Sequence, residues 1–172
     1  MGIQSYFIEK KIRQSLIEAK KNNSEHQLNK INKIALIVDE NSDFNAHQFS
    51  SLVNQLQLEE NNFDILSIKS KCNKGLDIKG YRFCTNEVNL FGHIKSESFI
   101  TFIEKDYDLM IDYVSKKNKY NRLIIAQVKA PLKAGFAQNN PYFYNIILNI
   151  KPENIEEFNN ELVRYLNILK LL

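Results

Sequence analysis

The most constraining feature of this sequence is a continuous apolar run at residues 34–38, which ends in Asp39 and has polar residues on both sides. Such a run is typical of a strand buried on both faces of a parallel sheet. Apolar residues at helical spacing follow between Phe44 and Leu56, and a second strand-like segment occupies 63–69. The order strand, helix, strand favours a right-handed parallel crossover and therefore an α/β fold.

The rest of the chain continues this alternation. Segment 70–95 is less regular, and we interpret it as an insertion with one short strand. Ser96 then begins another helix. The later expected elements are a strand over 107–113, a helix over 118–129, strands over 133–137 and 144–150, and a closing helix that begins at Pro152. Residues 123–128 also fit a strand, because a short apolar run is compatible with either structure.

The closing helix has a clear amphipathic pattern, with Pro152 in its first turn. Its expected buried stripe consists of Ile155, Phe158, Leu162, Tyr165, Leu166 and Leu169. Taken together, the elements predict a three-layer, Rossmann-like α/β domain with a mostly parallel sheet flanked by helices. We expect this domain to span residues 33–172, after an N-terminal helix and connector at 1–32.

The N-terminal segment carries the positive charge of the chain. Residues 1–33 contain seven Lys and Arg against three Asp and Glu, whereas the other 139 residues contain 16 against 17. Ile8, Ile12 and Leu16 are spaced by four and predict a basic amphipathic helix. Its expected partner-binding residues are Lys10, Lys11, Arg13, Lys20 and Lys21. Either this helix binds another molecule, or its apolar stripe packs on the α/β domain and its lysines face water.

A basic amphipathic helix suits three classes of partner: another protein, the phosphates of RNA, or an anionic membrane surface. No run of 18 apolar residues and no secretory signal pattern occurs in the sequence, and it has two cysteines, Cys72 and Cys84. We therefore expect a cytoplasmic protein without a transmembrane segment. A protein partner, bound through the N-terminal helix and the basic stretch 69–82, is the leading hypothesis.

Familiar catalytic motifs do not occur in the sequence. It has no Gly-x-x-x-x-Gly-Lys-Ser/Thr loop, no Gly-x-Gly-x-x-Gly loop and no Gly-x-Ser-x-Gly elbow. Cys72, Cys84 and His93 lack the paired spacing of known zinc folds. We therefore expect neither a catalytic residue nor a structural metal.

Acidic residues follow two of the expected strands, and they suggest an alternative function. Asp39 and Glu40 follow the first strand, and Asp112 ends the strand at 107–113. Ligands of open parallel sheets bind beyond the carboxyl ends of the strands, and carboxylates are suitable ligands for Mg²⁺. The alternative is a small-ligand or magnesium-binding domain, unless these residues are only solvated strand ends.

Parts of the sequence resemble known families. Residues 37–41 (Ile-Val-Asp-Glu-Asn), 109–112 (Leu-Met-Ile-Asp) and the pair Lys151 and Pro152 look like motifs of bacterial response-regulator receiver domains. The resemblance implies a degenerate receiver in which Asp39 and Glu40 hold Mg²⁺, Asp112 accepts a phosphoryl group and Lys151 contacts it. Residues 106–137 are similar to a strand-helix-strand piece in the acceptor half of heptosyltransferases of the GT-B fold.

A third resemblance covers nearly the whole chain. It is carried by five segments: 6–11, 91–95, 107–113, 129–136 and 158–169. Together they look like a family of small bacterial proteins known only as a domain of unknown function. This resemblance implies an α/β fold and no assigned activity, cofactor or functional residue.

Overall fold

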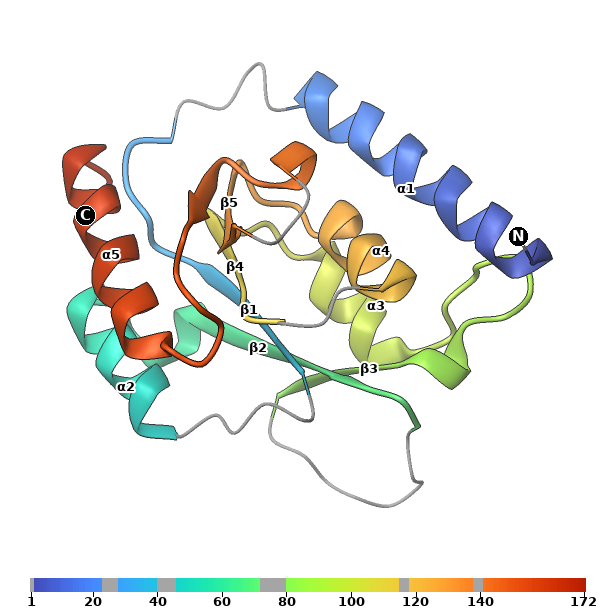
Figure 1. The fold of residues 1–172 in the computed structure, drawn as a ribbon, viewed down its shortest axis with the longest axis horizontal. Coiled ribbons are helices and arrows are strands. Elements are labelled where there is room, and N and C mark those ends of the chain that lie inside the picture. Colours follow the sequence, from blue (N-terminus) through green and yellow to red (C-terminus); the bar gives the residue numbers. More distant parts are fainter. Residues whose placement is uncertain (1, 23–27, 40–45, 72–79, 115–117, 138–140) are drawn as a thin grey trace.

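A six-stranded sheet forms the centre of the molecule (Figure 1). We describe it from a computed structural model that covers residues 2–22, 28–39, 46–71, 80–114, 118–137 and 141–172. The strands are β1 (Ile34–Asp39), β2 (Phe63–Lys69), β3 (Tyr81–Cys84), β4 (Leu109–Asp112), β5 (Leu132–Phe136) and β6 (Ile146–Leu148). Strand β3 is the short strand expected within 70–95, and it belongs to the sheet.

The strand order is β3-β2-β1-β4-β5-β6, and every neighbouring pair is parallel. This is the strand order of doubly wound sheets. In such sheets the chain first adds strands toward one edge and then returns to the middle and adds strands toward the other edge. Here that change falls between β1 and β4. Because β1 is central, all of its residues from Ile34 to Val38 are buried, which explains its uninterrupted apolar run.

Five α-helices in the described part of the chain cover the two faces of the sheet and complete the three layers (Figure 1). They are α1 (Ile3–Asn22), α2 (Ala46–Gln55), α3 (Glu97–Glu104), α4 (Lys119–Gln127) and α5 (Ile155–Ile168). Helices α1, α3 and α4 contribute to one apolar cluster, and α2 and α5 contribute to the other. The predicted α/β fold is therefore confirmed, including the helix at 118–129 that the sequence left open against a strand.

The closing helix corrects two details of the sequence interpretation. Pro152 precedes the helix rather than occupying its first turn, because the amide of Asn154 donates to the carbonyl of Lys151 and closes a turn with Pro152 at its second position. Tyr165 and Leu169 are 41% and 50% exposed, whereas Leu162 and Leu166 are fully buried. Tyr165 lies within the helix beside the buried stripe, whereas Leu169 follows the end of the helix at Ile168, and Leu171 packs in the core instead.

Candidate functional site

The acidic residues after β1 and β4 lie on neighbouring strands. Ile37 is opposite Asp112 in the parallel register, so Asp39 lies two residues farther along β1. Ile37 and Met110 belong to the same apolar cluster, and side chains alternate along a strand. Asp39 and Asp112 therefore lie on the same face of the sheet. Glu40 falls outside the described residues.

Asp112 is fully buried and its two carboxylate oxygens have protein partners. The amide of Val114 donates to Oδ1 over 3.0 Å, and the hydroxyl of Tyr144 donates to Oδ2. Burial, together with the charge of Asp112, raises the pKa of Tyr144 above its usual range. Asp112 thus connects the segment that follows β4 to the segment that precedes β6. The sequence did not indicate this structural role.

Lys151 is separated from the two aspartates in the sheet. It follows β6, and β5 lies between β6 and β4. The residue is exposed, and its carbonyl closes the turn before α5. Within the described part of the chain, no group of three His, Cys, Asp or Glu side chains is arranged to hold a metal ion. The receiver-like roles of Asp39, Asp112 and Lys151 stay predictions.

The N-terminal helix is fixed to the α/β domain through one face. Ile8 and Ile12 are buried in the apolar cluster that includes α4, with Leu16 packed against it. Glu9 forms an ion pair with Arg122 of α4. Gln4 accepts hydrogen bonds from the Nζ of Lys119 over 2.8 Å and from the hydroxyl of Tyr120 over 3.0 Å. The apolar stripe read from the sequence therefore packs on the α/β domain.

The predicted basic residues of α1 have different environments. Lys10 and Arg13 are exposed, whereas Lys11 is partly buried and burial lowers its pKa. Lys20 and Lys21 lie in the last turn of α1, and their side chains fall outside the described residues. Of the five residues, Lys10 and Arg13 are therefore the two that the structure presents to solvent.

Apolar side chains also occur on the outward face of α1. The exposed positions Ile3, Tyr6, Lys10, Arg13 and Ile17 are separated by alternating steps of three and four residues. This spacing places them in one stripe along the helix. Ile3 and Tyr6 are 70% and 60% exposed. The helix is therefore apolar on two faces, one buried and one open.

A turn at residues 89–92 lies beside the first half of α1 and adds exposed apolar side chains next to this stripe. The Oδ1 atom of Asn89 accepts hydrogen bonds from the amides of Phe91 and His93, both at 2.9 Å. Gly92, with a φ of +71°, allows the turn to approach Ile8 closely. The turn exposes Leu90 and Phe91 to solvent, and the Phe91 ring packs edge-on against Phe7 at 5.3 Å.

We define the outer α1 surface as Ile3, Tyr6, Lys10, Arg13 and Ile17 of the helix together with Leu90 and Phe91 of the turn. Sequence reasoning singled out its two basic residues and missed the apolar ones. The available signal was the presence of two large apolar residues, Leu90 and Phe91, in a turn directly before a glycine. Their position beside α1 depends on contacts between residues that are more than 80 positions apart.

Comparisons with known proteins identify a family but no activity. The sequence matches a family of unknown function, DUF6913, over residues 4–169. No curated protein and no solved structure matches the chain. A search of the described helices for a segment long and apolar enough to cross a bilayer finds none.

Proposed function

The chain belongs to DUF6913, a family of unknown function, and we propose that it is a non-catalytic module that binds another protein through the outer α1 surface. The observation that carries this proposal is the second apolar face of α1. Ile3, Tyr6, Leu90 and Phe91 are all more than half exposed and gather at one end of the helix. Contiguous exposed apolar side chains with polar neighbours are characteristic of interaction sites.

The rigidity of the surface supports the proposal. Contacts of Gln4, Glu9 and Ile8 with the body hold the helix in place without using its outward face. A surface that is already ordered loses little conformational entropy when a partner binds. The outer α1 surface is therefore already ordered before a partner binds.

The spacing and charge of the surface favour one kind of partner. A stripe with alternating steps of three and four residues matches the packing of one helix against another. Lys10 and Arg13, in the middle of the stripe, form no ion pair with any described carboxylate. We infer that the partner presents an amphipathic helix with apolar residues toward its ends and acidic residues at its centre.

The test uses a charge reversal on the outer α1 surface. Tagged full-length protein is recovered from cytosol with its bound partners, with and without nuclease treatment, and the products are identified by mass spectrometry. We expect one protein to be recovered with the wild type in stoichiometric amount, whether or not nuclease is added. The double variant Lys10→Glu, Arg13→Glu should no longer recover it. The matched control is Lys151→Glu, Lys170→Glu, which reverses two exposed charges elsewhere and should retain the partner.

Three results would contradict the proposal. A partner lost equally from both variants, or from neither, does not use the outer α1 surface. Recovery that disappears after nuclease treatment indicates a nucleic acid. Binding of the purified protein to vesicles of anionic lipid, without a protein partner, indicates a membrane surface instead.

A second candidate function is small-ligand or Mg²⁺ binding at the strand ends. It is supported by the adjacency of β1 and β4, which brings Asp39 and Asp112 to one face of the sheet at the point where winding changes direction. The test is a titration with Mg²⁺, with and without beryllofluoride as a phosphoryl analogue. A rise in melting temperature that is absent from Asp39→Asn would support this site, and no rise at millimolar Mg²⁺ would count against it.

A further inference from the structure

Helix α5 presents a stripe of charged and apolar side chains to solvent. The stripe lies opposite the residues that α5 buries against the sheet, and its members are separated by steps of four, three and four residues. Exposed apolar side chains lie beside its last member, Ile168, which is itself 61% exposed. We define the outer α5 surface as Glu157, Glu161, Arg164, Tyr165, Ile168 and Leu169. It is acidic toward the start of the helix and apolar at the C-terminal end.

The acidic part of the outer α5 surface is largely without positive partners. Glu157 forms no ion pair with a described residue, and neither do Glu153 and Glu156 nearby. Glu161 pairs with Arg164 over 2.7 Å, in an exposed contact of little strength. The outer α1 surface has the opposite charge in its middle, and its two basic residues also form no ion pair with a described carboxylate. The two surfaces are therefore complementary in charge.

The spacing of these charges agrees when α1 and α5 pack face to face in opposite directions. In one such arrangement Lys10 lies level with Glu161. Arg13 then lies within about 1.5 Å of the level of Glu157, since a helix rises about 1.5 Å per residue. Ile17 lies level with the residue before α5 and has no apolar counterpart there. Packing in the same direction would instead place the apolar end of α1 beside the acidic start of α5.

The apolar ends of the two helices meet in the same antiparallel arrangement. Ile3 lies level with Ile168, and Tyr6 lies level with Tyr165. The guanidinium group of Arg164 already lies over the ring of Tyr165, 4.9 Å from its centroid. The ring of Tyr6 would give this cation a second aromatic contact. One alignment therefore matches the apolar ends as well as the charged middle.

The apolar side chains that flank the two stripes also fall on the same side of this pairing. In α1, Phe7 directly follows an outward residue and packs against Phe91 of the turn. In α5, Tyr165 likewise directly follows an outward residue. Because both helices are right-handed, antiparallel face-to-face packing brings these two flanks together. Leu90 and Phe91, both more than half exposed, then lie beside Tyr165.

Helices α1 and α5 of one chain cannot make this contact with each other. They cover opposite faces of the sheet, since α1 packs in one apolar cluster with α3 and α4, and α5 packs in the other with α2 (Figure 1). Their outward faces therefore point away from each other. Each copy of the chain presents one surface of each kind, which is the arrangement of a head-to-tail interface.

We propose that the outer α1 surface binds the outer α5 surface of a second copy of this chain, with the two helices antiparallel. This inference rests on the proposed function, because it names a second copy as the protein that is bound. Each copy then contacts one neighbour through α1 and another through α5. Such contacts build a ring where the rotation between copies closes and a filament where it does not.

The test is sedimentation velocity of the purified full-length protein across the micromolar range. We expect the mean mass of the wild type to rise with concentration. Self-association should weaken by about tenfold or more in Lys10→Glu, Arg13→Glu, and equally in Glu157→Lys, Glu161→Lys, because each double variant sets like charges opposite one another. An equimolar mixture of the two variants should associate again, because it contains one unaltered surface of each kind.

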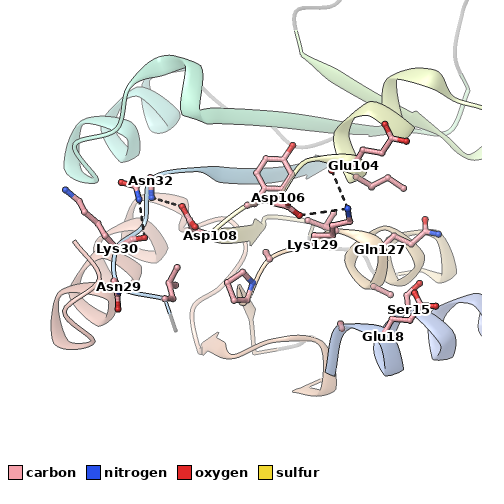
Figure 2. Close-up of a pocket in the computed structure, with 18 residues that line it drawn as sticks. Ser15, Glu18, Asn29, Lys30, Asn32, Glu104, Asp106, Asp108, Gln127 and Lys129 are labelled. Carbon is pink, nitrogen blue, oxygen red and sulfur yellow. Dashed lines mark hydrogen bonds and ion pairs between the residues drawn. The ribbon is translucent and has the colours of Figure 1, made fainter. Parts of the chain in front are cut away.

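A matched control reverses two acidic residues elsewhere. Glu104 and Asp106 are exposed and line a half-open cavity of about 1040 Å³ at the edge of the sheet where the strands begin (Figure 2). Neither belongs to the outer α1 surface or to the outer α5 surface. The double variant Glu104→Lys, Asp106→Lys should therefore self-associate as the wild type does.

Several outcomes would overturn the inference. They are a wild type that stays monomeric, an α5 variant that associates as the wild type does, a mixture of variants that stays monomeric, and a control variant that is weakened equally. The failure of the proposed function is a separate result. If the purified protein is monomeric but a different protein is recovered from cytosol and is lost from Lys10→Glu, Arg13→Glu, the proposed function stands and the second copy is the wrong partner.

Discussion

At the scale of single residues, Lys133 of β5 shows how a polar group is accommodated in the interior. Its Nζ atom is buried and donates to the carbonyls of Ile125 and Val128, at 2.6 and 2.8 Å. These carbonyls belong to the end of α4, where backbone acceptors lack partners within the helix. Lys133 therefore caps the helix that precedes its own strand, and burial lowers its pKa to about 8.

This lowered pKa predicts a specific dependence of stability on pH. Between about pH 8 and 10.5, the unfolded chain binds a proton at Lys133 that the folded chain has released. The free energy of unfolding should therefore rise with pH in that window, by about 3 kcal/mol in total from this group. The measurement is a series of urea melts of wild type and Lys133→Met.

The difference in the free energy of unfolding between wild type and Lys133→Met separates the contribution of Lys133 from that of the buried tyrosines. Burial raises the pKa values of Tyr107, Tyr113 and Tyr144, so their ionisation in the unfolded chain removes stability above about pH 10. That loss is common to wild type and Lys133→Met and cancels in the comparison. If the free energies of unfolding of the two proteins run parallel between pH 8 and 10.5, the pKa of Lys133 is not lowered.

At the scale of elements, α5 has a buried face and an exposed face with different consequences for substitution. Phe158, Leu162 and Leu166 are fully buried against the sheet, and the Phe158 ring contacts Tyr113 and Phe136 at 5.2 and 4.6 Å. The helix is thus held by packing rather than by its own propensity. Its outward residues face solvent and contribute much less.

We expect Leu162→Ala to lower the free energy of unfolding by about 2–5 kcal/mol, because it leaves a cavity between the helix and the sheet. Leu169→Ala removes a side chain of the same size from a half-exposed position, and should cost well under 1 kcal/mol. Urea denaturation of both variants checks the pair. Similar losses in the two would mean that the buried face of α5 is assigned incorrectly.

At the scale of the whole molecule, α1 is part of the same packed unit as the sheet. Ile8 and Ile12 lie in one apolar cluster with β1, β4 and α4. The sequence analysis separates a helix and connector at 1–32 from an α/β domain at 33–172. The packing instead leads us to expect that removal of α1 uncovers core surface, so point variants are the better test of its outward face.

The prediction at this scale concerns cooperativity. Ile8→Ala should destabilise the entire protein by about 2–5 kcal/mol, whereas Ile17→Ala, on the exposed stripe, should leave stability within about 0.5 kcal/mol of wild type. Hydrogen exchange measured on both variants gives the check. If Ile8→Ala speeds exchange only in α1 and leaves α4 and the sheet protected, α1 unfolds independently of them.

The sequence by itself determined the elements whose pattern is a direct result of burial. The apolar run of β1, the stripe of α5 and the serine that caps α3 could each be read locally, because burial on one or two faces imposes a period on neighbouring residues. The spacing of Ile8, Ile12 and Leu16 likewise indicated the face of α1 that is buried. These features need no knowledge of distant contacts.

Only the tertiary structure decided which distant residues meet. Phe91 lies beside Phe7, Tyr144 donates a hydrogen bond to Asp112, and residues of four separate segments line one cavity. None of these pairings has a sequence signal, because they depend on strand order and on how each helix is placed over the sheet. Periodicity reports that a residue is buried or exposed, but the neighbours it meets there are set by the packing of the whole chain.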